Sequence, residues 1–199
     1  GQELEDDRLS RCWDEAARAF EFEETQNRVE AFNSENRFKK KGLAVMPVCF
    51  GISFTKTFFN QGSSLVHVYT DGSVSVATGG IEMGQGVSSN MIEICSRSLG
   101  IPVSQIKSNS TNTSRIANIS PSAASATTDL NGNATIIACN KILDGMKQVA
   151  AEDLGCDSSV ISLENAKVLK DGTDTGLSWN DLVSKTYMSR VPLMAHGFY

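Results

Sequence analysis

Two short apolar runs on either side of an Asp-Gly pair constrain the fold more than any other feature of this sequence. Hydrophobic and polar residues alternate over residues 65–69 and 74–78, and Asp71 and Gly72 lie between the two runs. An Asp-Gly pair in this setting is a strong signal for a β-hairpin, and the alternation puts the valines of both strands on one buried face. These valines are Val66, Val68, Val74 and Val76. Glycines and then a helical pattern follow the second run, which predicts an α+β fold with a sheet packed against helices.

The rest of the chain shows further helical and strand-like patterns. Apolar residues recur at helical spacing in four segments, residues 6–20, 22–34, 87–99 and 123–151. β-Rich stretches predict strands over residues 42–54 and near 103–107, and a short hairpin over 157–178. Ser178 is placed to cap a last helix. Residues 108–122 are almost wholly polar, and so long a polar stretch inside a compact domain is usually either functional or disordered.

Composition and charge argue against several classes of protein. The chain has 199 residues with a formal net charge of −5, and 40% of the residues are hydrophobic. An acidic chain lacks the basic face that binds nucleic acid, and no apolar run reaches the length of about 18 residues that suggests a membrane span. The acidic, polar first residues do not resemble a signal peptide. We therefore expect a cytoplasmic protein that binds neither nucleic acid nor membrane.

Cysteine and histidine usage bears on metal binding. The five cysteines are scattered singly, which predicts reduced thiols packed as small apolar residues. The two histidines, His67 and His196, lie far apart in the sequence, and the usual zinc-ligand spacings are missing. We interpret His67 as a half-exposed residue of the sheet. If the protein uses a metal, we expect that side chains of this chain do not hold it.

The glycine-rich segment 79–86 is the first candidate functional feature. It joins the predicted strand to the predicted helix, and such a turn exposes backbone N–H groups at a helix N-terminus, where anions such as phosphate bind. Its four glycines allow a ligand to approach the backbone, and the uncharged amide of Gln85 can hydrogen-bond an oxo group or a heterocycle. Judged by its glycines alone, the segment is more typical of a structural turn than of a site.

A second candidate feature is the polar segment 120–129. It gathers small residues and hydroxyls at the start of the predicted long helix, which makes a second site suited to an anion. An ordinary helix start that uses serine and proline explains the same residues equally well. Either feature alone is compatible with a non-catalytic anion- or nucleotide-binding module, or with a purely structural one.

Taken together, these segments resemble the molybdenum region of hydroxylases of the xanthine dehydrogenase type. The matching stretches occur in order along nearly the whole chain. They are KGLAVMP (41–47), FGISFT (50–55), FFNQGSSLVHVYTDGSV (58–74), GGIEMGQG (79–86), IPVSQI (101–106), TNTSRIANISPSAASATTD (111–129) and HGFY (196–199). An ordered series of this kind is far more specific than any one motif in it.

The resemblance implies that residues 1–40 form a helical lead-in and that residues 41–199 form part of a molybdopterin-binding domain in a longer protein. The cofactor's dithiolene sulfurs ligate molybdenum in that family, so no protein ligand to the metal is implied. The implied cofactor-binding residues are Met83, Gly84, Gln85, Gly86, Ala124, Ser125, Ala126, Thr127 and Thr128. The implied substrate-binding residues are Phe54, Thr55, Ala123 and Ala124. Without the resemblance, Phe54 would be interpreted as a core aromatic residue.

The family's reaction is hydroxylation of a heteroaromatic carbon, such as that of a purine, with oxygen derived from water. Electrons then pass through 2Fe–2S clusters and FAD to NAD, all bound outside this chain. The family's glutamate base lies in a Gly-Glu-Pro-Pro-like segment that this sequence lacks. We therefore assign no catalytic residue here, Glu82 included, and expect the chain alone to be inactive and to hold molybdopterin weakly.

Partners and alternatives follow from the same resemblance. The implied partners are the remaining domains or subunits of the enzyme, in a homodimeric parent protein. The nearest alternative is an aldehyde oxidase-type hydroxylase that acts on aldehydes, although Phe54 and Thr55 fit the purine pattern better.

Overall fold

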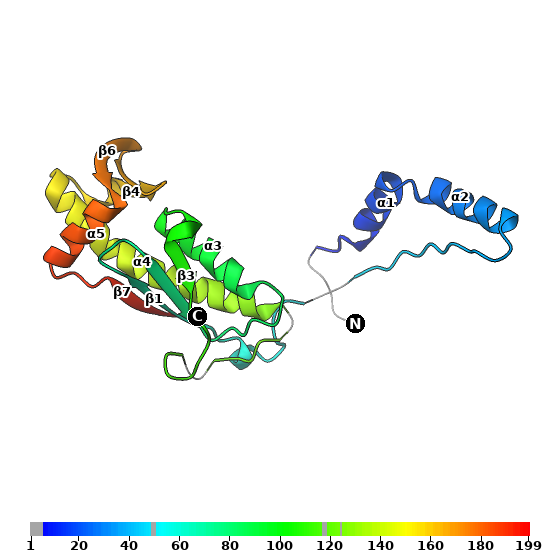
Figure 1. Ribbon diagram of the computed structural model, residues 1–199, viewed down its shortest axis with the longest axis horizontal. Coiled ribbons are helices and arrows are strands. Elements are labelled where there is room, and N and C mark those ends of the chain that lie inside the picture. The colour runs from blue at the N-terminus through cyan, green and yellow to red at the C-terminus, as the bar shows by residue number, and fades with distance from the viewer. Residues whose placement is uncertain (1–5, 49–50, 117–118, 124) are drawn as a thin grey trace. The chain divides into compact units, whose positions relative to one another are not determined.

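The computed structural model describes residues 6–48, 51–116, 119–123 and 125–199. The chain divides into two compact units, Gly1–Phe50 and Gly51–Tyr199, each considered by itself below (Figure 1). Among the described residues, no helix combines the length and the apolar character that crossing a bilayer requires.

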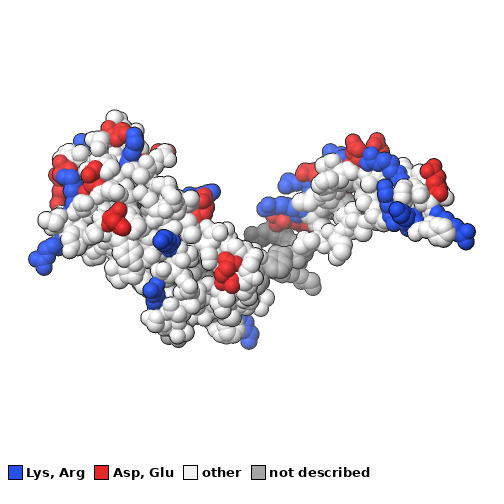
Figure 2. Space-filling model, in the orientation of Figure 1, with Lys and Arg blue, Asp and Glu red and all other residues white. Residues whose placement is uncertain are grey.

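The first unit contains the two predicted helices, α1 (Leu9–Ala19) and α2 (Phe22–Glu35). The side chain of Asn33 on α2 binds the backbone of Lys41, accepting from its N–H at 2.8 Å and donating to its carbonyl at 3.0 Å. No side chain of residues 6–48 is buried. The described part of this unit therefore has helices but no hydrophobic core, and Figure 2 shows acidic and basic side chains interspersed on its surface.

The strand predicted over residues 42–54 is wrong. Residues 42–48 and 51–54 contain no strand, and most of their side chains are exposed. A strand is stable only when a neighbouring strand pairs with its N–H and C=O groups, and here the sheet is built from other segments. The apolar composition of this stretch was a misleading signal, because β-propensity reports packing that a partner must supply.

The main sheet of the second unit is built on the predicted hairpin. Strands β1 (Ser63–Val68) and β2 (Val74–Thr78) pair antiparallel, with Val66 opposite Val76 and Val68 opposite Val74. All four valines are buried, as the alternation predicted. Strand β3 (Ile106–Ser108) pairs parallel to β2, and β7 (Met194–Phe198) pairs antiparallel to β1. The order across the sheet is therefore β3-β2-β1-β7.

Two helices pack against this sheet. The first, α3 (Val87–Leu99), matches its predicted bounds and ends at Gly100 in the left-handed conformation, with φ +69°. The second, α4 (Ala126–Leu154), is a continuous helix that contacts α3, β1 and β7 (Figure 1). The centre of the core lies between these elements and includes Val66, Val76, Met91, Cys95, Ala138, Cys139, Ile142 and Met146.

The C-terminal part of the second unit adds a small sheet and a helix. Where the sequence predicted a hairpin over 157–178, three strands form, β4 (Ile161–Glu164), β5 (Lys167–Lys170) and β6 (Thr173–Ser178). Ser178 then caps α5 (Trp179–Met188) through a capping box with Asp181, as predicted for Ser178. Short 3₁₀ turns complete the fold, η1 (Thr57–Phe59), η2 (Val103–Gln105) and η3 (Ser158–Val160).

Candidate functional site

The glycine-rich segment forms a tight loop between β2 and α3. Gly84 and Gly86 adopt positive φ angles of +99° and +81°, a conformation that disfavours other residues. A Cβ atom built on either glycine would meet nothing within 4 Å. Backbone conformation, rather than lack of space, therefore requires glycine here, and the loop's backbone is open to a ligand from that side.

The side-chain carboxylate of Glu82 lies at the start of α3. Its Oε1 accepts the backbone N–H groups of Gly84 at 2.9 Å and Gly86 at 3.0 Å, and its Oε2 accepts that of Ser88 at 2.9 Å. The bonds from Ser88 and Gly86 lower the pKa of the Glu82 carboxyl below its ordinary value. The N–H groups of Gly84, Gly86 and Ser88 are therefore already bound by the chain's own carboxylate.

Gln85 is bonded within the same loop. Its Oε1 accepts the N–H of Met83 at 2.6 Å, and its Nε2 donates to the carbonyl of Ile81 at 2.7 Å. Nε2 carries two hydrogens, so these two bonds leave one for a ligand. Met83 beside it has a side chain that is 67% exposed. Both predicted contact residues thus lie at the surface of the loop.

The second predicted segment enters α4. Ser125 stands at the N-cap with no side-chain cap bond, and it is exposed. Ala126 and Thr127 are buried, and Thr128 is half-buried. Ala124, predicted to contact both cofactor and substrate, lies outside the described residues.

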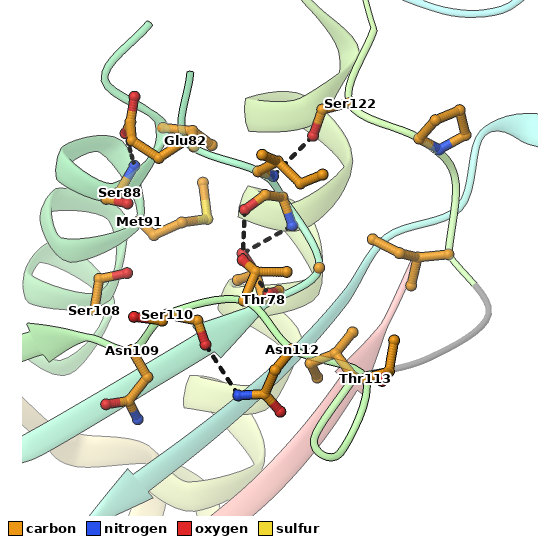
Figure 3. Close-up of a pocket in the computed structure, with 18 of the residues that line it drawn as sticks. Thr78, Glu82, Ser88, Met91, Ser108, Asn109, Ser110, Asn112, Thr113 and Ser122 are labelled. Carbon is orange, nitrogen blue, oxygen red and sulfur yellow. Dashed lines mark hydrogen bonds between the residues drawn. The ribbon is translucent and has the colours of Figure 1, made fainter. Parts of the chain in front are cut away.

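The fold brings the two predicted cofactor segments together. The backbone N–H of Ile81 donates to Ser122 Oγ at 2.8 Å, and Asn90 Nδ2 on α3 donates to Thr128 Oγ1 at 3.1 Å. Figure 3 shows the Ser122 bond beside the end of β2. A Cβ atom on Gly80 would approach Thr127 Cγ2 to 2.7 Å, so glycine is needed for this close packing. Sequence reasoning did not single out Asn90, and only its position in the first turn of α3 could have indicated it.

A pocket of about 730 Å³ lies beside this junction (Figure 3). Its walls come from the end of β2, from α3, and from the polar stretch 108–122 that the sequence had marked as unusual. Thr111 ties that stretch to the end of β2, since its Oγ1 lies within donating distance of the carbonyls of Thr78, at 3.2 Å, and Gly80, at 2.8 Å. Among the described residues that line it, Glu82 is the only ionisable one, and neither Met83–Gly86 nor 125–128 forms part of the lining. The polar stretch thus builds the pocket next to the loop.

The predicted substrate residues lie on a neighbouring segment. Phe54 is half-buried, and its N–H and carbonyl both bind the Asn60 side chain, at 2.8 and 3.0 Å. Thr55 is exposed, whereas Ala123 is half-buried. The segment is tied to the entrance of α4, because the backbone N–H of Gln61 donates to Ser120 Oγ at 3.2 Å. Phe54 is thus bound to Asn60, and the next residue, Gln61, is bound to Ser120, six residues before the start of α4.

The donor chemistry of these segments suits an uncharged or phosphorylated organic group. The loop carries the side-chain amide of Gln85, and the start of α4 carries the hydroxyls of Ser125 and Thr128. The loop N–H groups of Gly84, Gly86 and Ser88 are bound to the Glu82 carboxylate. Within the described ranges, no three His, Cys, Asp or Glu residues are grouped so that they could hold a metal ion. His67 is half-buried in the sheet beside Tyr69, their ring centroids 6.3 Å apart.

Comparison with known proteins defines the class. Residues 15–199 match the family model described as the molybdopterin cofactor-binding domain, and the chain belongs to this family. The resemblance found in the sequence is thereby confirmed. Along its full length the chain is 43% identical to a xanthine dehydrogenase/oxidase of Mus musculus over 198 residues, and 39% identical to a xanthine dehydrogenase of Oryza sativa subsp. japonica over 199 residues. The chain spans 13% of the length of each of these relatives.

Solved structures support the fold. Quinoline 2-oxidoreductase from Pseudomonas putida 86 superposes with a TM-score of 0.64 at 22% identity, over 70% of this chain and 19% of that one. Reconstituted CO dehydrogenase from Oligotropha carboxidovorans superposes with a TM-score of 0.63 at 24% identity, over 69% of this chain and 18% of that one. At this level of identity, the similarity shows a shared α+β fold only.

Proposed function

We propose that this chain forms one wall of the molybdopterin site in a molybdenum hydroxylase of the xanthine dehydrogenase type. The observation that carries the proposal is the junction of the glycine-rich loop with the start of α4, held by the Ile81–Ser122 and Asn90–Thr128 bonds. These bonds join two segments that lie about 40 residues apart in the sequence, and both segments supply residues proposed to contact the cofactor.

The residues of this chain that would hold the cofactor are those at the two segments. Gln85 offers a side-chain amide, and Ser125 and Thr128 offer hydroxyls, which suit the oxygens of a phosphate and the polar edge of a pterin. The backbone N–H groups of Met83, Gly84 and Gly86 are bound within the loop, so these three residues are proposed to contact the cofactor by packing. Ala126 and Thr127, which are buried, support the start of α4. The bound cofactor supplies the hydroxylation chemistry, and the protein supplies binding and orientation.

Xanthine or hypoxanthine is the proposed substrate. The relatives at 43% and 39% identity are a xanthine dehydrogenase/oxidase and a xanthine dehydrogenase, which favours a purine over an aldehyde. Phe54 and Thr55 are the residues of this chain proposed to contact the purine. The glutamate base, the 2Fe–2S clusters and the FAD that passes electrons to NAD are proposed to lie elsewhere in a cytoplasmic, homodimeric parent protein.

The test uses the full-length protein that contains this chain. We expect near-stoichiometric molybdenum, measured by mass spectrometry, and oxidation of xanthine in preference to an aromatic aldehyde, measured by ultraviolet absorbance. Gln85→Ala should remove most of this activity, because it deletes the amide proposed to contact the cofactor. Gln148→Ala on the exposed face of α4 should leave it unchanged. A wild-type protein without molybdenum, or equal activity of the two variants, contradicts the proposal.

A further inference from the structure

Glu82 has a role that neither the motif nor the family assignment provides. Three backbone N–H groups of the loop, those of Gly84, Gly86 and Ser88, converge on its two carboxylate oxygens. Figure 3 shows Glu82 turned toward Ser88 at the start of α3. Two of the three donors belong to glycines at positive φ, which have many accessible conformations when they are not held.

The electrostatic setting favours the ionised carboxyl. The N-terminus of α3 carries the positive end of the helix dipole, and the described residues of the pocket lining include no cationic side chain that could compete with the N–H groups for the carboxylate. A charged acceptor makes stronger hydrogen bonds with N–H groups than a neutral one does. Ser122 and Thr111 bind only the first part of the segment, at Ile81 and Gly80. Among the side-chain bonds to the turn at residues 83–86, those of Glu82 are therefore the ones made by a charged group.

We infer that Glu82 is the positioning residue of the cofactor loop: its carboxylate holds the turn from which Met83, Gly84 and Gln85 are presented. The part of this inference that concerns the cofactor rests on the proposed function, whereas the part that concerns the loop does not. Gln85 depends on the same turn, because its side chain bridges the carbonyl of Ile81 and the N–H of Met83 on either side of Glu82. Loss of the carboxylate should therefore release Gln85 without any direct contact between the two side chains.

The first experiment measures amide hydrogen exchange by NMR in this chain. In Glu82→Ala, the amides of Gly84, Gly86 and Ser88 should exchange about tenfold faster, because each loses a bond to a charged acceptor. The side-chain amide signals of Gln85 should shift toward those of a solvated glutamine, while core amides such as that of Val66 stay protected. Unchanged exchange at all three loop amides overturns the inference.

A conservative variant gives a graded result. In Glu82→Gln the side chain keeps one acceptor oxygen and gains an amide group that only donates. It can therefore bind either the Gly84 and Gly86 pair or Ser88, and only part of the protection should survive. Glu93→Ala is the matched control, since Glu93 is an exposed glutamate of α3 that binds Arg97. Complete protection of all three amides in Glu82→Gln would contradict the inference, because it would mean that the second carboxylate oxygen of Glu82 has no role.

The second experiment measures molybdopterin content per chain in the full-length protein. Glu82→Ala should lower it severalfold, and Glu93→Ala should match the wild type. If Glu82→Ala contains as much molybdopterin as the wild type, Glu82 has no role in cofactor binding. Absence of molybdopterin from the wild type instead contradicts the proposed function and the cofactor link together, and the exchange experiment still decides whether Glu82 holds the loop.

Discussion

At the scale of single residues, Gly197 shows how closely β7 crosses α4. The residue is buried, and a Cβ atom built on it would lie 1.9 Å from the carbonyl oxygen of Ala134 and 2.8 Å from the backbone nitrogen of Ala138. Both are backbone atoms of a long helix, so neither can rotate away as a flexible side chain could. Any other residue at this position must push the strand from the helix.

Gly197→Ala should therefore lower the free energy of unfolding by about 3 kcal/mol, at the upper end of what overpacking costs. Gly155→Ala is the control, because Gly155 has φ +60° but nothing within 4 Å of an added Cβ. That variant should lower the free energy of unfolding by only about 1–2 kcal/mol, the cost of a left-handed conformation for a residue other than glycine. Urea denaturation measures both values, and an equal loss in the two variants would show that the packing at Gly197 is looser than described.

Ser178 and Asp181 form a second residue-scale feature, the cap of α5. Two hydrogen bonds from Ser178 lower the pKa of the Asp181 carboxyl below its ordinary value of 3.8. The bond from the Ser178 hydroxyl has the larger effect, and the bond from its backbone N–H adds to it. A carboxyl whose pKa is lower in the folded state stabilises the fold above its unfolded pKa. This contribution is lost as the pH falls through the folded pKa.

We therefore expect Asp181→Asn to lower the thermal midpoint at pH 7, and the difference from the wild type to vanish as the pH falls below 3.8. Ser178→Ala should cost about 1 kcal/mol at neutral pH through loss of the N-cap. Thermal melts followed by circular dichroism across this pH range measure the effect. A difference for Asp181→Asn that persists unchanged in acid would show that the charge of Asp181 is not its cause.

At the scale of elements, the contact between α3 and α4 is the centre of the core. Cys95 on α3 and Cys139 on α4 are both 0% exposed, and their sulfur atoms lie 3.7 Å apart. The hydrogen bond with Cys95 and burial raise the pKa of the Cys139 thiol above its ordinary value. A buried thiol with a raised pKa is a poor nucleophile, because the thiolate is the reactive form.

Labelling with N-ethylmaleimide should therefore distinguish the cysteines. Cys12 is exposed and should react at once in the native protein, whereas Cys95 and Cys139 should react only as fast as the core unfolds. Peptide mass spectrometry with and without denaturant gives the three rates. Rapid labelling of Cys139 in the native chain would mean that α3 and α4 separate far more readily than their packing indicates.

At the scale of the whole molecule, hydrophobic burial among the described residues is confined to the second of the two units. Every buried apolar residue of the described chain lies between Val66 and Val183, in the second unit. Residues 6–48 of the first unit bury no side chain. The two compact units of the structure meet between Phe50 and Gly51. The boundary between the helical lead-in and the molybdopterin-binding domain, predicted between residues 40 and 41, remains a prediction.

The two units should therefore behave differently as separate polypeptides. Residues 51–199 should unfold cooperatively on heating, because they contain the core. Residues 1–50 should show weak helicity and no cooperative transition, because isolated helices of 11 and 14 residues are marginal in water. Circular dichroism of each polypeptide measures this. A sharp melting transition of 1–50 would show that this unit has a core of its own.

Features with a local signal could be predicted from the sequence. The hairpin at Asp71 and Gly72 and the bounds of α3 follow from alternation, helical spacing and glycine, all of which act within a few residues. The cap of α5 by Ser178 is equally local. The family resemblance also needed only the order of motifs along the chain, and the match over residues 15–199 confirms it.

Contacts between distant segments were decided by the tertiary structure alone. The pairing of β7 with β1 joins Ser63 to Phe198, and no local pattern encodes so distant a partner. Long-range pairing also explains why the strand predicted over 42–54 was wrong. The segment has the composition of a strand, but its described residues, 42–48 and 51–54, do not pair with the sheet. The same limit also explains the site: the sequence indicated two segments suited to anions, but only the fold joins them at Ser122 and Thr128. Likewise, only the fold shows that the carboxylate of Glu82 already binds the N–H groups at the start of α3.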